Sequence, residues 1–143
     1  MTTEVERVYE IDAPVNAVWE FIADDELRAE AISFVDHYEV DGDTVIWKLG
    51  LPIPALPGSV RVRTRDVERR EPTYVKFVGT SRIMDVEGEH ELTATEGGCR
   101  VRNRFVVTGH LPGVEGFFKR NIDSEIDRLI RTVADHLRQQ STE

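Results

Sequence analysis

Apolar side chains recur with a helical period over the last part of the chain, after a long stretch in which they alternate one by one. From Val114 to Leu137 they fall three and four positions apart, and the stripe continues to about residue 139. At 1.5 Å per residue, a helix of this length measures ~40 Å. The pattern predicts one long amphipathic helix, with charged residues such as Asp123 and Glu125 on its other faces.

The residues before this helix alternate apolar and polar side chains, as strands with one buried face do. A first run covers 4–11, and six more follow at 34–40, 45–51, 60–65, 75–79, 84–92 and 101–107. Turn residues such as Asp41-Gly42 separate the runs, which predicts antiparallel hairpins. A two-residue turn at Gly97-Gly98 would set His90 opposite Phe105 and Leu92 opposite Asn103.

Two short helices are expected between the first strand and the second. Pro14 suits a first helical turn, and Val18, Trp19 and Ile22 follow it at helical spacing. A second helix is expected over 24–32, because the carboxylates of 24–26 suit a helix N-terminus. No repeat, low-complexity tract or linker divides the chain, so residues 1–143 are expected to form a single α+β domain.

Composition excludes several classes of function. The chain carries 18 Lys and Arg against 27 Asp and Glu, and a net charge of −9 argues against a nucleic-acid binder, which needs a basic face. One cysteine excludes an internal disulfide, and four scattered histidines show no metal-ligand spacing. No apolar run approaches the ~20 residues that span a bilayer, and the N-terminus shows no signal sequence. We therefore expect an acidic, cytoplasmic protein without stable membrane insertion.

Two segments resemble a known family. Residues 8–22, Val-Tyr-Glu-Ile-Asp-Ala-Pro-Val-Asn-Ala-Val-Trp-Glu-Phe-Ile, resemble the opening of START-like (SRPBCC) proteins, a strand followed by small-Pro and a Val-Trp helix. Residues 107–113, Val-Thr-Gly-His-Leu-Pro-Gly, are similar to the branch that holds polyketide cyclases/dehydrases and carbon monoxide dehydrogenase-associated proteins. The resemblance implies a helix-grip fold, a curved seven-stranded antiparallel sheet around the long C-terminal helix. It does not choose among the family's functions.

Several polar residues fall on the apolar faces of the predicted strands. They are Arg7, Asp36, Thr64, Asp66, His90 and Asn103. Burying such groups in a dry core is costly unless each finds a partner. A partly hydrated cavity is the interpretation favoured for His90 and Asn103, with hydrogen-bonded core residues as the alternative. For Arg7, Asp36 and Asp66 the alternative is a slipped register or an exposed strand end.

Aromatic residues and an apolar loop complete the predicted cavity. Its wall would include Trp47, Phe77, Phe105, Phe117 and Phe118, which could also be ordinary core. In an antiparallel meander the 51–58 loop, the Ser81-Arg82 turn and the 109–113 link should lie at one end. Leu51, Ile53, Leu56 and Leu111 would then flank a hydrophobic mouth with a mobile lid.

No nucleophile elbow, phosphate loop or metal motif occurs in the sequence. We therefore predict a protein that binds or carries a hydrophobic small molecule (a lipid, isoprenoid or polyketide-like compound) between sheet and C-terminal helix, without a cofactor. One alternative is a cyclase or dehydratase with His90 as candidate acid/base. Another is a module that docks on a membrane-associated enzyme through the 51–58 loop. The predicted ligand-binding residues are Asp36, Trp47, Leu49, Ile53, Leu56, Phe77, His90, Asn103, Phe105, Phe117 and Phe118.

Overall fold

The computed structural model describes residues 2–24, 34–51, 53 and 58–141. Its elements are β1 (Thr2–Ile11), α1 (Val15–Ala23), β2 (Val35–Asp41), β3 (Thr44–Leu49), β4 (Val60–Arg70), β5 (Tyr74–Thr80), β6 (Met84–Thr95), β7 (Gly98–Gly109) and α3 (Val114–Ser141). The described residues between β1 and β2 hold one short helix, α1. The second helix expected over 24–32 falls almost wholly on residues 25–33, which lie outside the described part of the chain.

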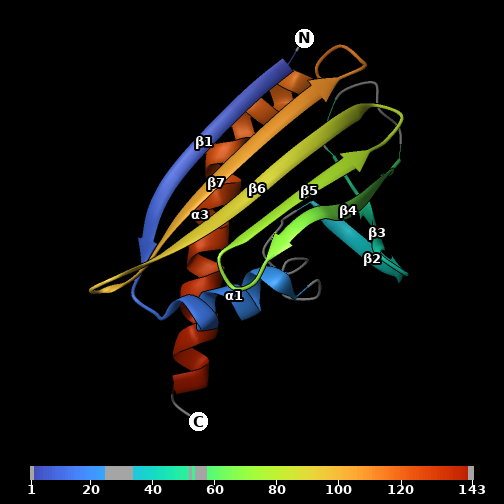
Figure 1. The fold of residues 1–143 in the computed structure, drawn as a ribbon. Helices are drawn as coiled ribbons and strands as arrows, with labels where there is room; N and C mark the ends of the chain where they lie inside the picture. Colours follow the sequence, from blue (N-terminus) through green and yellow to red (C-terminus); the bar gives the residue numbers. More distant parts are fainter. Residues whose placement is uncertain (1, 25–33, 52, 54–57, 142–143) are drawn as a thin grey trace.

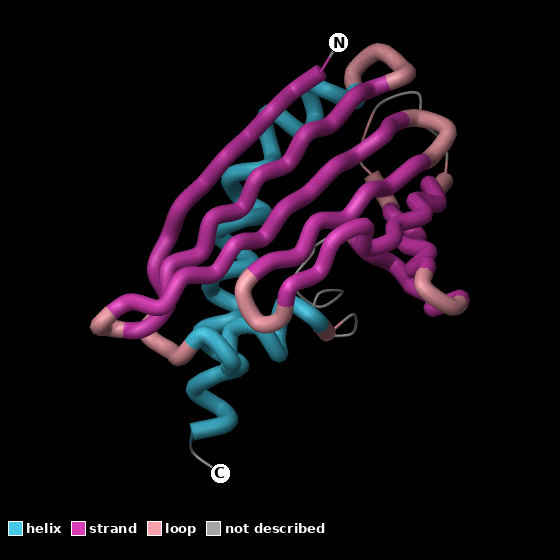
Figure 2. Tube along the Cα trace, viewed as in Figure 1, coloured by secondary structure: helices cyan, strands magenta, loops and turns pink. Residues whose placement is uncertain are grey.

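All seven strands form one antiparallel sheet in the order β1-β7-β6-β5-β4-β3-β2. The sheet curves around α3, which packs against β1 and β7, as Figure 1 shows. Helix α1 packs against β6, β7 and the C-terminal half of α3, and the same layers are visible in the trace of Figure 2. This is the α+β helix-grip arrangement that the order of elements and the family resemblance predict.

The register of the β6–β7 hairpin differs from the prediction by two residues. Thr95 pairs with Gly98, so the turn residues are Glu96 and Gly97, and His90 lies opposite Asn103 rather than Phe105. Gly98 belongs to the strand because a Cβ there would lie 2.3 Å from the carbonyl oxygen of Ile11 at the end of β1. A shift of two positions preserves the face of every side chain, so the predicted inner and outer faces remain correct.

The outer face of the sheet carries a network of ion pairs around Glu89. Its carboxylate accepts hydrogen bonds from Tyr74 (3.1 Å), Arg102 (3.3 Å) and Arg104 (3.0 Å). Arg104 also contacts Glu4 at 2.7 Å. Because these arginines are paired with carboxylates, this part of the face is a structural ion-pair network, as expected, rather than an open anion-binding patch.

Buried apolar side chains form two clusters at opposite ends of the space between the sheet and α3. The α1 cluster comprises Ile11, Val18, Trp19, Phe21, Ile22, Val75, Leu92, Cys99, Val101 and Val133. The connection cluster comprises Leu51, Ile53, Val60, Val62, Ile83, Met84, Val107, Val114 and Phe117. The described residues contain no helix long and apolar enough to cross a membrane.

The connection cluster corrects the prediction of an exposed apolar mouth. The three connections do meet, since Leu51 and Ile53 pack with Ile83 and Val114, and the His110 amide donates to the Ile83 carbonyl (2.8 Å). Leu51 and Ile53 are only 5% and 7% exposed, so they are core residues rather than a lid. The prediction failed because an apolar loop next to a helix end can bury its own side chains. Leu111 is exposed, and Leu56 lies outside the described residues.

Candidate functional site

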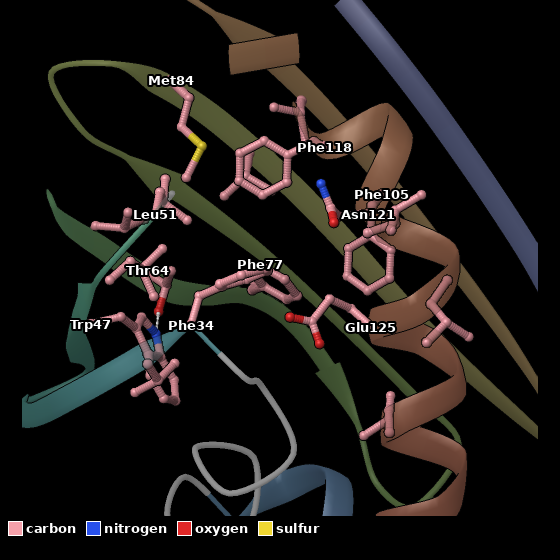
Figure 3. Close-up of a pocket in the computed structure, with 18 of the residues that line it drawn as sticks. Phe34, Trp47, Leu51, Thr64, Phe77, Met84, Phe105, Phe118, Asn121 and Glu125 are labelled. Atoms are coloured by element: carbon pink, nitrogen blue, oxygen red, sulfur yellow. Dashed lines mark hydrogen bonds between the residues drawn. The ribbon is translucent and has the colours of Figure 1, made fainter. Parts of the chain in front are cut away.

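A cavity of about 220 Å³ lies between the inner face of the sheet and α3. Side chains from both layers converge on it in Figure 3, in the space between the α1 cluster and the connection cluster. The sheet contributes Val35, Trp47, Leu49, Val62, Thr64, Phe77, Val86, His90, Phe105 and Val107. The remaining lining residues are Ile22, Phe34, Leu51, Met84, Phe118, Asn121, Ile122, Glu125, Ile126 and Leu129.

Three rings on adjacent strands form the floor of the cavity. The Phe77 ring stacks against the His90 ring with centroids 6.2 Å apart, and the Phe105 ring meets His90 edge-on at 5.9 Å. Gly88 lies between Phe77 and Phe105 in the sheet, paired with both. Because Gly88 has no side chain, the Phe77 ring can lie across β6 at this point.

Trp47 and Thr64 form a polar contact within an otherwise apolar wall. The Trp47 indole Nε1 donates to the Thr64 hydroxyl at 2.8 Å, and that hydroxyl donates to the carbonyl of Val45 at 3.3 Å. Both side chains are buried, and both line the cavity. Thr64 is therefore an inward polar residue whose hydrogen bonds are satisfied inside the protein.

His90 belongs to a chain of hydrogen bonds that runs across three strands. Its Nδ1 lies 2.7 Å from Asn103 Oδ1, and Asn103 Nδ2 donates to the Tyr9 hydroxyl at 3.1 Å. An amide oxygen only accepts, so this arrangement places the proton on His90 Nδ1. Burial is the main cause that raises the pKa of Tyr9 to about 12, which keeps its hydroxyl neutral. The His90 ring is therefore held in one orientation and one tautomer.

The two predictions for His90 and Asn103 separate in the structure. His90 lines the cavity although only 6% of it is exposed, whereas Asn103 is fully buried and lies behind the wall. Asn103 is thus the hydrogen-bonded core residue of the alternative interpretation. It supports the site by orienting His90 rather than by lining the cavity.

Helix α3 adds two polar residues that the sequence interpretation missed. Asn121 and Glu125 line the cavity, and Figure 3 shows both side chains pointing from α3 toward its interior. Both continue the apolar stripe, because Phe118, Ile122, Glu125 and Leu129 are spaced by four, three and four positions. That spacing was the available signal. The prediction assigned Glu125 to the solvent faces because its charge was given more weight than its position.

Two predicted inward carboxylates lie outside the cavity for a shared reason. The strand register shifts between Val35 and His37, and again between Asp66 and Glu68. Each irregularity interrupts the alternation of faces, and both Asp36 and Asp66 are exposed. The inward placement of these two residues was wrong.

Other predicted residues lie near the cavity without lining it. Arg7 does lie on the α3 side of the sheet, where it is half exposed and pairs with Asp123. Phe117 is buried in the connection cluster and contacts the Phe118 ring edge-on, with centroids 5.3 Å apart. Ile53 belongs to the same cluster. Of the predicted ligand-binding residues, those that line the cavity are Trp47, Leu49, Phe77, His90, Phe105 and Phe118.

The site offers hydrophobic binding with few polar groups. Within the described part of the chain no group of three His, Cys, Asp or Glu side chains could hold a metal ion. His90 is the one titratable group on the described sheet wall, and Glu125 is its counterpart on α3. The arrangement can bind an apolar molecule and orient it at a small number of polar contacts.

A protein-family model described as polyketide cyclase/dehydrase and lipid transport matches residues 2–139. Among solved structures, the Zhui aromatase/cyclase from Streptomyces sp. R1128 is 13% identical with a TM-score of 0.74, covering 99% of this chain and 96% of that one. A START superfamily protein from Mycobacterium smegmatis is 10% identical with a TM-score of 0.77, covering 96% and 98%. A conserved protein from Geobacillus kaustophilus is 18% identical with a TM-score of 0.69, covering 94% of both chains.

Identities this low show a shared fold and leave the ligand undetermined. The comparison with curated protein sequences gives no match. The family match covers nearly the whole chain, and the strand order and the grip of the sheet on α3 agree with it. The chain therefore belongs to the polyketide cyclase/dehydrase family of START-like (SRPBCC) proteins.

Proposed function

We propose that this protein binds a hydrophobic small molecule in the cavity between the sheet and α3. The observation that carries the proposal is an apolar space of about 220 Å³ between two well-packed clusters. Protein interiors are close-packed, and an unfilled apolar space loses the contacts that its lining would otherwise make. A ligand would restore those contacts. The family description, which joins polyketide cyclases with lipid transport, supports the same use of the cavity.

A cyclase or dehydratase is the second candidate, and the geometry of His90 is what favours it. The ring lines the cavity and is held through Asn103 by the Tyr9 hydroxyl. A histidine oriented in this way could act as a general acid/base toward a bound substrate. Turnover lost in His90→Gln while affinity is retained would support catalysis, and equal loss of both would support binding alone.

The third class, a docking module, has less support. It relied on exposed apolar side chains in the 51–58 loop, and Leu51 and Ile53 are buried. A protein partner at this loop would have to displace two side chains of the connection cluster.

Trp47 provides a reporter for the binding proposal, and Trp19 provides its control. Trp47 lines the cavity, whereas Trp19 is buried in the α1 cluster with the Arg69 guanidinium 5.4 Å from its ring centre. Titration with an apolar probe such as naphthalene should change the emission of Trp19→Phe, which retains Trp47, in a saturable way. The emission of Trp47→Phe, which retains Trp19, should change little.

A second pair of variants tests the location of binding. Val86 lines the cavity, and Val86→Phe should fill part of it and weaken binding of the probe at least about tenfold. Val78 lies on the neighbouring strand with its side chain on the opposite face, so Val78→Phe should leave the affinity unchanged. Equal affinities for the two variants would show that the probe binds elsewhere. Native mass spectrometry of the purified protein would then show whether any molecule is retained.

A further inference from the structure

We propose that the ligand of this cavity is a compact compound of one or two rings, with a hydroxyl group on the edge that faces α3. This inference rests on the proposed binding function and narrows it to a ligand class. It depends on three properties of the cavity, namely its volume, its ring-lined walls and the polar atoms that α3 presents.

The volume limits the ligand to about two rings. Ligand pockets commonly measure ~300–1,000 Å³, and an engineered apolar cavity of ~150 Å³ holds one benzene molecule. This cavity, at about 220 Å³, lies between those two references. It therefore suits a skeleton the size of naphthalene, whereas a four-ring compound or a long acyl chain would need the walls to move.

The walls favour a flat ring system. Phe77 and Phe105 lie on the sheet side with ring centroids 6.4 Å apart, and Phe118 faces them from α3. Trp47 closes one end, where its indole nitrogen is already bonded to Thr64. Aromatic rings interact with one another by offset stacking and edge-to-face contact, which adds to the area buried. An aromatic ligand gains more from these walls than a flexible chain of equal volume.

The helix side determines the polar group of the ligand. Asn121 Nδ2 donates to the carbonyl of Phe117 at 2.7 Å, which leaves its Oδ1 as the side-chain atom able to accept a hydrogen bond from a ligand. Glu125 lies one helical turn further along the same face, and an ionised carboxylate also only accepts. A ligand group beside these two residues must therefore donate, as a hydroxyl group does and an ether does not.

Calorimetric titration at pH 7 with four probes tests the inference. The probes are naphthalene, 2-naphthol, 2-methoxynaphthalene and 1-hydroxypyrene, which differ in ring number and in the ability to donate. We expect 2-naphthol to bind about tenfold more tightly than naphthalene and 2-methoxynaphthalene, the ratio that one good hydrogen bond provides. 1-Hydroxypyrene should bind at least about tenfold more weakly than 2-naphthol.

Substitution at Asn121 separates the polar contact from the cavity as a whole. In Asn121→Leu, the preference for 2-naphthol over naphthalene should fall to about twofold or less, while naphthalene affinity, which also reports folding, stays within about twofold. Equal affinities for 2-naphthol and 2-methoxynaphthalene in the unaltered protein would overturn the hydroxyl assignment. Binding of 1-hydroxypyrene as tightly as 2-naphthol would overturn the size limit. Failure of all four probes to bind the folded protein would contradict the proposed function itself.

Discussion

The Phe77 ring lies so close to Gly88 that a Cβ at Gly88 would stand 2.3 Å from two of its ring carbons. The two residues are paired across β5 and β6, and both belong to the floor of the cavity. A bulkier residue at Gly88 would force the ring away from the sheet. The depth of the cavity therefore depends on one missing side chain in β6.

Gly88→Ala should move the Phe77 ring into the cavity and reduce ligand binding. We expect probe affinity to fall at least about tenfold and the free energy of unfolding to fall by about 1–3 kcal/mol, the usual cost of overpacking. Titration and denaturant unfolding measure the two effects. Gly97→Ala is the matched control, because nothing lies within 4 Å of a Cβ at that turn position. Unchanged affinity in Gly88→Ala would show that the Phe77 ring does not border the ligand.

Asn103→Leu should destabilise the protein strongly despite its similar size. It would remove the partner of both His90 Nδ1 and the Tyr9 hydroxyl, and a buried polar group left unpaired costs about 1–3 kcal/mol. We expect a total loss of about 2–4 kcal/mol in urea unfolding. Asn16→Leu, at an exposed position of α1, should change stability by less than about 0.5 kcal/mol.

The same network predicts that substitutions at Tyr9 and Asn103 are not additive. Tyr9→Phe removes the hydroxyl that accepts from Asn103 Nδ2. Its cost should be smaller when Asn103 is already leucine, because the shared hydrogen bond is then absent. A double-mutant cycle in urea measures the coupling. Strict additivity would show that the hydrogen bond contributes nothing to stability.

Glu89 should make stability depend on pH in the acid range. Burial alone would raise the pKa of its carboxyl, but hydrogen bonds from Tyr74, Arg102 and Arg104 together lower it below the ordinary value. A depressed folded pKa adds stability that is fully present above the unfolded value of ~4.3 and is lost as pH falls through the folded pKa.

Glu89→Gln should therefore lower the free energy of unfolding by about 1–3 kcal/mol at pH 7. The difference from the unaltered protein should shrink as pH falls below ~4.3. Glu91→Gln is the control, since Glu91 is 45% exposed and contacts Arg102 at 3.5 Å, and its effect should be smaller. Urea midpoints between pH 7 and pH 3 give the comparison. A Glu89→Gln difference that does not change with pH would contradict the assigned pKa shift.

Ile53 and Leu111 should respond differently to the same substitution. Ile53→Ser would leave a space and a hydroxyl in the connection cluster, so we expect a loss of about 2–4 kcal/mol in the free energy of unfolding. Leu111 is 48% exposed, and Leu111→Ser should change stability by less than about 0.5 kcal/mol. Similar melting temperatures for the two variants would show that the Ile53 segment is not part of the core.

The regular elements could be predicted from the chain because their signals are local. Alternation placed Val62, Thr64, His90 and Phe105 on the inner face, and the structure confirms each of these orientations. The apolar spacing of 114–137 predicted α3 in the same way. Each pattern depends on the fixed geometry of a strand or helix, which neighbouring elements change little.

Alternation failed wherever the backbone geometry departed from regularity. Bulges after Val35 and Asp66 exposed two carboxylates predicted to point inward. The turn of the β6–β7 hairpin moved by one residue because Gly98 is needed where β7 approaches the end of β1. Such irregularities depend on contacts between strands that are distant in the chain.

The sequence by itself determined the faces of the strands, the position of the long helix and the family. Only the tertiary structure decided which inward side chains fill the core and which border a cavity. Ile53 and Asn103 are core, whereas His90 and Glu125 line the open space. The physical reason is that a cavity is the volume left between packed elements. That volume depends on the curvature of the sheet, its distance from α3 and the missing side chain at Gly88, and no local pattern specifies all three together.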